Sequence, residues 1–176
     1  MKFVALSGSL RDLSYNRSAL KALSILSGDI ADICIVSLGD LPLFNPDREQ
    51  EYIPAVASLK SHLKTANGLI ISSPEYAHGI SGVMKNALDW LVSGDEFVNI
   101  PIMNINTSPR ATHAQQMLRE VLVTMSGVII EKSCVAISLL GTTLDAQGII
   151  ADVPLSGLLK TGLQQFCIEI RKSEVG

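Results

Sequence analysis

Residues 7–15 carry the side-chain types that bind a phosphate group. Three serines (Ser7, Ser9, Ser14) and Arg11 lie between an apolar run and a segment with leucines at helical spacing. Backbone N–H groups at a helix start, hydroxyls and a guanidinium all attract an anion. The stretch therefore predicts a phosphate site, although a solvated loop before a helix capped by Asn16 also fits these residues.

A second stretch, SSPEYAHGISG at residues 72–82, could form a wall beside a flat ring. Tyr76 and Ile80 could flank the face of such a ring, and backbone amides could meet its polar edge. His78 could act as a base, as a donor to an anionic ring, or only as a polar loop residue. Glu75 could hold the loop in shape rather than touch a ligand.

A third stretch, NTSPRATHA at residues 106–114, adds hydroxyls and charge after another apolar run. Thr107 and Ser108 offer hydroxyls, and Arg110 offers a guanidinium. His113 falls where the next helix should begin, which favours a structural role for it.

The sequence contains no motif for catalysis by side chains. It has no GxGxxG, no GK[ST], no GxSxG, no HExxH and no CxxC. We therefore predict no metal site and no catalytic side chain. A cofactor that carries the chemistry itself would explain this absence of acids, bases and nucleophiles.

Composition limits the class of protein further. A net charge of −3 over 176 residues gives no support to a nucleic-acid or membrane partner. Cys34 and Cys134 lie in apolar runs, where we expect buried thiols. The apolar stretch at the start of the sequence is too short for a signal peptide, and no apolar run is long enough to span a membrane. A reducing cytoplasm is the expected location.

Apolar runs alternate with helical patterns along the whole chain, which predicts one α/β domain over residues 1–176 with a parallel sheet. In such a sheet the ligand binds at the carboxyl ends of the strands, where the three polar stretches fall. The expected strands are 3–7, 31–38, 68–73, 101–106 and 133–139. The expected helices are 16–27, 54–66, 81–92, 112–127 and 153–172.

Two stretches resemble the signatures of the NADPH-dependent FMN reductase family. GSLRDLSYN at 8–16 resembles its phosphate loop, roughly GSxRxxSxN, and PEYAHGISGVMKNALDWL at 74–91 resembles its second signature. The likeness covers about residues 1–140. It implies a flavodoxin-like three-layer sandwich with a five-stranded parallel sheet in the order 2-1-3-4-5.

The resemblance also implies residues that bind FMN. Those near the phosphate would be Ser9, Arg11, Ser14, Tyr15 and Asn16. Those beside the isoalloxazine ring would be Pro74, Glu75, Tyr76, Ala77, His78, Gly79 and Ser108. The chain departs from the family pattern at Ala77, His78 and Ser81, and its turn after residue 109 is shortened.

The family's activity implies an enzyme that passes a hydride from NADPH or NADH to flavin N5 and then to an acceptor. Quinones, free flavins, azo compounds and metal oxyanions are the expected acceptors. A flavodoxin-like electron carrier and a flavin-binding redox sensor are the alternatives; the charge of −3 and 5% aromatic residues weigh against the carrier. Family members pair through the helix expected at 81–92, which implies a homodimer or homotetramer. Trp90 in that helix fits either a core position or an interface.

Overall fold

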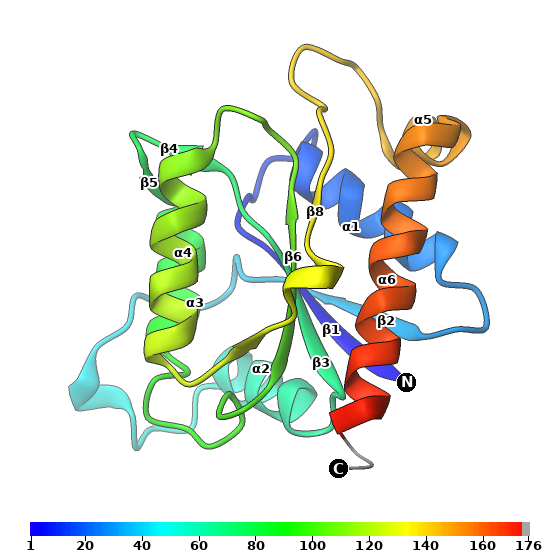
Figure 1. The fold of residues 1–176 in the computed structure, drawn as a ribbon. Helices are drawn as coiled ribbons and strands as arrows, with labels where there is room; N and C mark the ends of the chain where they lie inside the picture. The colour runs from blue at the N-terminus through cyan, green and yellow to red at the C-terminus, as the bar shows by residue number, and fades with distance from the viewer. Residues whose placement is uncertain (174–176) are drawn as a thin grey trace.

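The computed structural model describes residues 1–173, which form a parallel sheet between two layers of helices (Figure 1). The strands of the main sheet are β1 (Lys2–Ser7), β2 (Asp32–Val36), β3 (Gly68–Ser72), β6 (Pro101–Asn106), β7 (Val128–Ile129) and β8 (Val135–Ala136). They follow the order β2-β1-β3-β6-β7, and β8 also pairs with β6. The flavodoxin-like fold class is thereby confirmed.

The helices lie where the sequence predicts them, apart from one short addition. They are α1 (Tyr15–Leu26), α2 (Pro54–Lys64), α3 (Gly82–Asp89), α4 (Thr112–Thr124), α5 (Ala146–Ala151) and α6 (Val153–Ser173). Two 3-10 turns, Pro46–Arg48 and Glu131–Ser133, and a small hairpin of β4 (Glu75–Tyr76) and β5 (Gly79–Ile80) complete the secondary structure. Helix α5 was not predicted, because six residues are too few to show a helical period.

The two faces of the sheet bury separate apolar cores. Phe3 and Ala5 of β1 pack with α1, α5 and α6, whereas Val4 and Leu6 pack with α2, α3 and α4. Successive side chains of a strand point to opposite faces, so covering both faces requires apolar residues at every position of β1. This is why the strands read as continuous apolar runs.

The expected fifth strand at 133–139 is wrong in detail, because that edge of the sheet is split. The chain pairs with β6 at β7, leaves the sheet in the turn Glu131–Ser133, and pairs with β6 again at β8. Ser133 closes the turn: both its N–H (2.9 Å) and its hydroxyl (2.7 Å) donate to the carbonyl of Ile130. The main sheet therefore has six strands rather than five.

Exposure of Cys34 also contradicts the sequence expectation. Cys34 lies on β2, which is the outermost strand on its side of the sheet, and its side chain is exposed. The apolar run around Cys34 does not show that β2 is an outermost strand, because the order of the strands in the sheet is set by the tertiary fold. Cys134 is half-buried and Cys167 is buried.

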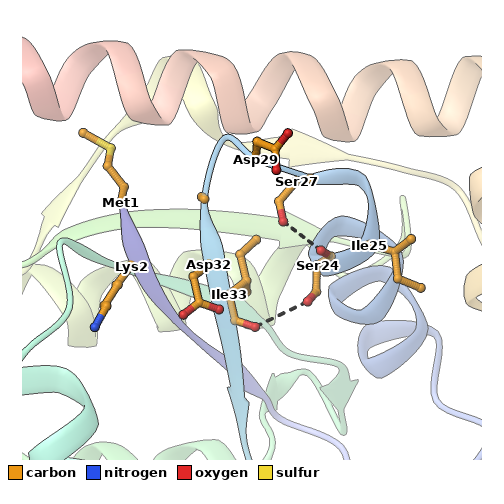
Figure 2. Close-up of a pocket in the computed structure, with 10 residues that line it drawn as sticks. Met1, Lys2, Ser24, Ile25, Ser27, Asp29, Asp32 and Ile33 are labelled. Atoms are coloured by element: carbon orange, nitrogen blue, oxygen red, sulfur yellow. Dashed lines mark hydrogen bonds between the residues drawn. The ribbon is translucent and has the colours of Figure 1, made fainter.

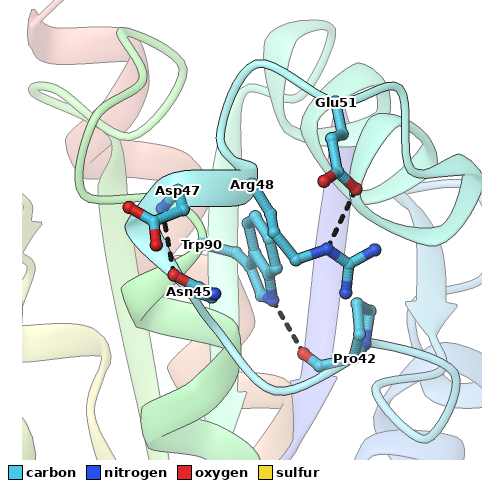
Figure 3. Close-up of polar contacts among 6 residues, drawn as sticks. All are labelled: Pro42, Asn45, Asp47, Arg48, Glu51 and Trp90. Atoms are coloured by element: carbon cyan, nitrogen blue, oxygen red, sulfur yellow. Dashed lines mark hydrogen bonds and ion pairs between the residues drawn. The ribbon is translucent and has the colours of Figure 1, made fainter.

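The segment 37–53, between β2 and α2, is held against α3 and its C-cap by two side chains, of which Figure 3 shows Trp90. Trp90 donates its indole N–H to the carbonyl of Pro42 at 2.8 Å, and Asn86 donates to the same oxygen at 2.9 Å. Asn86 also accepts from the N–H of Phe44. Trp90 is only 3% exposed, so it belongs to the core and is not available as an interface anchor.

Candidate functional site

Three loops meet at the carboxyl ends of β1, β3 and β6 and enclose a cavity of about 390 Å³. This volume lies within the range of pockets that hold cofactor-sized ligands. The cavity extends over the ends of these three neighbouring strands, of which β3 is the middle one. Its lining residues are Ser9, Arg11, Leu13, Ser14, Tyr15, Asn16, Ser73, Pro74, Glu75, Tyr76, Asn106, Thr107, Ser108, Arg110, Ala111 and Leu140.

Nine of the twelve residues expected at a flavin site line this cavity. They are Ser9, Arg11, Ser14, Tyr15, Asn16, Pro74, Glu75, Tyr76 and Ser108. Ala77, His78 and Gly79 lie outside it, at the turn of the β4–β5 hairpin. Leu13, Ser73 and Leu140 were not singled out from the sequence; no motif marks Leu140, which follows the split edge strand.

The phosphate-loop side of the cavity is rich in hydrogen-bond donors. The N-cap of α1 is Ser14, whose hydroxyl accepts from the N–H of Arg17 at 3.3 Å. The N–H groups of Tyr15 and Asn16, in the first turn of α1, have no partner among the described residues. Free N–H groups at a helix start attract anions, and this first turn contains no acidic residue.

Asn16 has a different role from the cap that the sequence suggested. It lies inside the helix and is 5% exposed, and its side-chain oxygen accepts from the hydroxyls of Ser72 (2.9 Å) and Thr107 (3.1 Å). Asn16 thus ties the start of α1 to the ends of β3 and β6. Because its oxygen is occupied, the amide N–H₂ group is the part of Asn16 that remains free to donate.

Gly8 lets the first loop approach the second closely. Its N–H donates to the carbonyl of Ser72 at 2.9 Å, and a Cβ on Gly8 would lie 2.3 Å from the hydroxyl oxygen of Ser73. That hydroxyl oxygen of Ser73 is buried and has no partner among the described residues. Polar groups of this kind in a cavity wall fit a polar ligand.

Tyr15 lines the cavity with its ring, but its hydroxyl already donates to the carbonyl of Thr142 at 2.5 Å. This bond joins α1 to the loop between β8 and α5. The side chain of Tyr15 therefore fits as an apolar wall, and only its backbone N–H is left to donate to a phosphate.

The carboxylate of Glu75 contacts both the start of α4 and the turn of the β4–β5 hairpin. One carboxylate oxygen accepts from the N–H of Ala114, in the first turn of α4, at 2.8 Å. The other lies 3.3 Å from Nδ1 of His78, whose ring makes an edge-to-face contact with His113 at 4.7 Å between centroids. Glu75 is thus confirmed as a residue that holds this loop in shape. His113 lies in the first turn of α4, as the sequence indicated, and its side chain is exposed.

A second hollow, of about 510 Å³, lies at the amino ends of the strands, and its position and lining do not fit the expected flavin site (Figure 2). It is lined by the amino ends of β1 and β2 and the last turn of α1. Its serines bond to backbone carbonyls: Ser27 donates to Ser24 at 2.7 Å, and Ser24 donates to Ile33 at 3.3 Å. Ligands of open parallel sheets bind at the carboxyl ends instead.

The fold and the cavity define a flavodoxin-like α/β protein with a donor-rich pocket at the carboxyl ends of its strands. The chain belongs to the NADPH-dependent FMN reductase family, whose pattern it matches over residues 1–140. The first motif, the second motif and β6 all fall within the matched residues.

Relatives support the same family. An NAD(P)H-dependent FMN reductase of Pseudomonas aeruginosa is 31% identical, with 98% of this chain and 96% of the relative covered. A 2-hydroxy-1,4-benzoquinone reductase of a Burkholderia species is 29% identical, with 99% of each covered. The flavoenzyme FerB of Paracoccus denitrificans, an NAD(P)H:(acceptor) oxidoreductase, superposes with a TM-score of 0.81 at 25% identity, with 97% of each chain covered.

The residues of the cavity fit FMN in three respects. Arg11 and the free N–H groups of α1 match a phosphate, Pro74 and Tyr76 supply a wall for a ring, and the buried hydroxyl of Ser73 lacks a partner. No cluster of metal ligands occurs within residues 1–173. In the same residues, no helix has the length and apolar character needed to cross a membrane.

Proposed function

We propose that the chain binds FMN in the three-loop cavity and uses NAD(P)H to reduce a small-molecule acceptor. The observation that carries this proposal is the meeting of nine family-implied residues around one cavity at the carboxyl ends of the strands. Relatives are described as a quinone reductase and an NADPH azoreductase, which supports quinones and azo compounds as acceptor classes.

In this proposal the phosphate binds at the first loop. The N–H groups of Tyr15 and Asn16 donate to it, and Arg11 offers a charged fork from the same loop. Ser9 is 6% exposed, and its hydroxyl accepts from the N–H of Arg11 at 3.4 Å, which leaves its own O–H free to donate. Donors fixed in this way bind an anion without reorganising.

The ring lies against the second loop. Tyr76 is 51% exposed and Pro74 is half-buried, so both present apolar surface that a flat ring can cover. FMN held by these residues would supply the redox chemistry that carries reducing equivalents from NAD(P)H to the acceptor. The protein's part is to orient the two ligands in turn, and Glu75 keeps the ring wall in place through α4.

Anaerobic reduction tests this function. Purified protein loaded with FMN is mixed with NADPH, and we expect rapid loss of the flavin's visible absorption, followed by its return when a quinone is added. A holoprotein that NADPH does not reduce would instead be an electron carrier or a redox sensor. Protein that takes up no FMN would refute the site.

We further propose a homodimer that pairs through α3, with a homotetramer as the larger assembly. Exposed apolar side chains near this helix support the proposal, since Val92, shortly after α3, is 61% exposed and Met117 on α4 is 49% exposed. Light scattering on purified protein gives the mass directly. A monomer at micromolar concentration would contradict the proposal.

A cytoplasmic location completes the proposal. The three cysteines are free, and Cys34 is exposed without a partner thiol, which suits a reducing compartment. Fractionation of cells that express a tagged chain tests this, with recovery in a membrane or secreted fraction as the contradicting result.

A further inference from the structure

A second arginine stands on the side of the cavity opposite the phosphate loop. Arg110 follows β6, whereas Arg11 follows β1, and β3 lies between these two strands. Neighbouring strands are roughly 4.8 Å apart, so the two loops start about 10 Å from each other. One phosphate held at the helix start of α1 therefore leaves Arg110 available for a different group.

Arg110 has no charged partner within the protein. Of the lining residues, Arg11 and Arg110 are cationic and Glu75 is acidic. The carboxylate of Glu75 is occupied by the N–H of Ala114 and by His78, and no acid of residues 1–173 lies within ion-pair distance of Arg110. The side of the cavity formed by the third loop is thus positively charged in a chain whose net charge is negative.

The backbone that carries Arg110 is held in place by its own loop. The N–H of Ser108 donates to the side-chain oxygen of Asn106 at 3.0 Å, and the N–H of Arg110 donates to the hydroxyl of Ser108 at 3.4 Å. The N–H of Ala111 donates to the carbonyl of Ser108 at 3.1 Å. These bonds hold the backbone of Arg110 at the cavity rim, so only its exposed side chain has to be ordered when the guanidinium binds an anion.

We propose that Arg110 is a specificity-determining residue that binds an anionic group of the second ligand, the one that exchanges electrons with the flavin. This inference rests on the proposed function. The shared chemistry is a phosphate, sulfonate or carboxylate. Its source is either the nicotinamide nucleotide or a negatively charged acceptor, and neutral acceptors gain nothing from Arg110.

The test compares Arg110→Gln and Arg110→Lys with Arg171→Gln as a matched control. Arg171 is an exposed arginine in the last turn of α6, outside the cavity, and it also lacks an ion-pair partner among the described residues. Calorimetry measures the affinity of each apoprotein for FMN and of each oxidised holoprotein for NADP⁺ and NAD⁺. Steady-state assays give kcat/KM for anthraquinone-2-sulfonate and for benzoquinone.

Two results support the proposal and separate the two sources. If the nucleotide supplies the anion, Arg110→Gln weakens NADP⁺ binding about tenfold, the size expected for one charge-assisted hydrogen bond. If the acceptor supplies it, nucleotide binding is unchanged, and the preference for the sulfonated quinone over benzoquinone falls about tenfold. In both cases Arg110→Lys keeps part of the affinity or preference that Arg110→Gln loses. The FMN affinity of both variants stays at the wild-type value.

Two results overturn it. Loss of FMN affinity in Arg110→Gln would place Arg110 at the cofactor, and unchanged values for all ligands would leave it without a role in specificity. Wild-type protein that takes up no FMN overturns the proposed function and this inference together. Normal FMN uptake with unaffected variants overturns the inference alone.

Discussion

Replacement of Gly8 by alanine tests whether close approach of the first two loops builds the cavity. The new Cβ would lie 2.3 Å from the hydroxyl oxygen of Ser73, 2.9 Å from its Cβ, and 2.9 Å from the hydroxyl oxygen of Ser81. All three distances are shorter than a normal van der Waals contact, so one of the loops must move. The φ angle of Gly8 is not in the left-handed region, so the cost comes from crowding alone.

The size of the effect follows from two opposing terms. Overpacking of this kind costs about 1–3 kcal/mol. A glycine-to-alanine change also restricts the unfolded chain, which stabilises the fold by about 0.4–1 kcal/mol. The net loss is about 1.5 kcal/mol, which lowers the Tm of a protein of this size by roughly 3–6 °C.

Thermal unfolding of the apoprotein and an FMN titration measure the two consequences. We expect Gly8→Ala to melt lower and to bind FMN more weakly, because the two loops that line the cavity move apart. Gly157→Ala is the control, since Gly157 lies on the exposed side of α6 with no heavy atom within 4 Å of its added Cβ. We expect the control to be at least as stable as the wild type.

A double variant isolates the crowding. Ser73→Gly removes both Ser73 atoms that the added Cβ would meet, so it should restore part of the Tm that Gly8→Ala loses. A Gly8→Ala protein as stable as the Gly157→Ala control would refute the reasoning, as would a loss that Ser73→Gly leaves unchanged.

Three further perturbations test other parts of the structure. Arg11→Ala should weaken FMN about tenfold but leave riboflavin binding unchanged, because only FMN has the phosphate; equal losses for both ligands in a fluorescence titration would contradict this. Ser126→Gly should raise the free energy of unfolding, measured by urea denaturation, by about 0.5–1 kcal/mol, since Ser126 lies just after α4 with a φ of 64°. An unchanged free energy of unfolding would show that the backbone at Ser126 is not strained. Cys34 should react first with a thiol reagent at neutral pH, because it is exposed whereas burial raises the pKa of both Cys134 and Cys167; mass spectrometry of modified peptides checks the order.

Much of the fold could be predicted because local signals and the tertiary structure agree. Pro54 begins α2 as predicted, and the apolar runs at 3–7, 68–73 and 101–106 are strands within a residue or so. Both faces of these strands are covered, so burial at most of their positions left a plain pattern in the sequence.

The failures occur where a residue's role depends on a distant partner. Ser14 and Asn16 are both good caps, and only the hydroxyls of Ser72 and Thr107 decide that Asn16 turns inward. The edge of the sheet was predicted as one strand, because the turn that Ser133 closes is decided by pairing with β6 on both sides. Three loops were expected to carry the site, and their meeting around one cavity could be seen only from the strand order.

Ser126 and Gly127 have different roles after α4. The helix expected at 112–127 would have ended on Gly127, but α4 ends at Thr124, and the left-handed residue is Ser126. Gly127 donates its N–H to Leu122, and a Cβ there would lie 2.6 Å from Ile102. The glycine is needed for close packing of α4 on the sheet rather than for its backbone freedom.

The divided outer strand beside β6 also affects how copies of this chain can meet. Each of β7 and β8 has only two residues, and the turn between them interrupts the row of backbone groups that a strand from another molecule would need. Growth of the sheet from one copy into the next is blocked on that side. On that side of the molecule, association between copies is therefore left to the helical faces, where side chains rather than backbone groups select the partner.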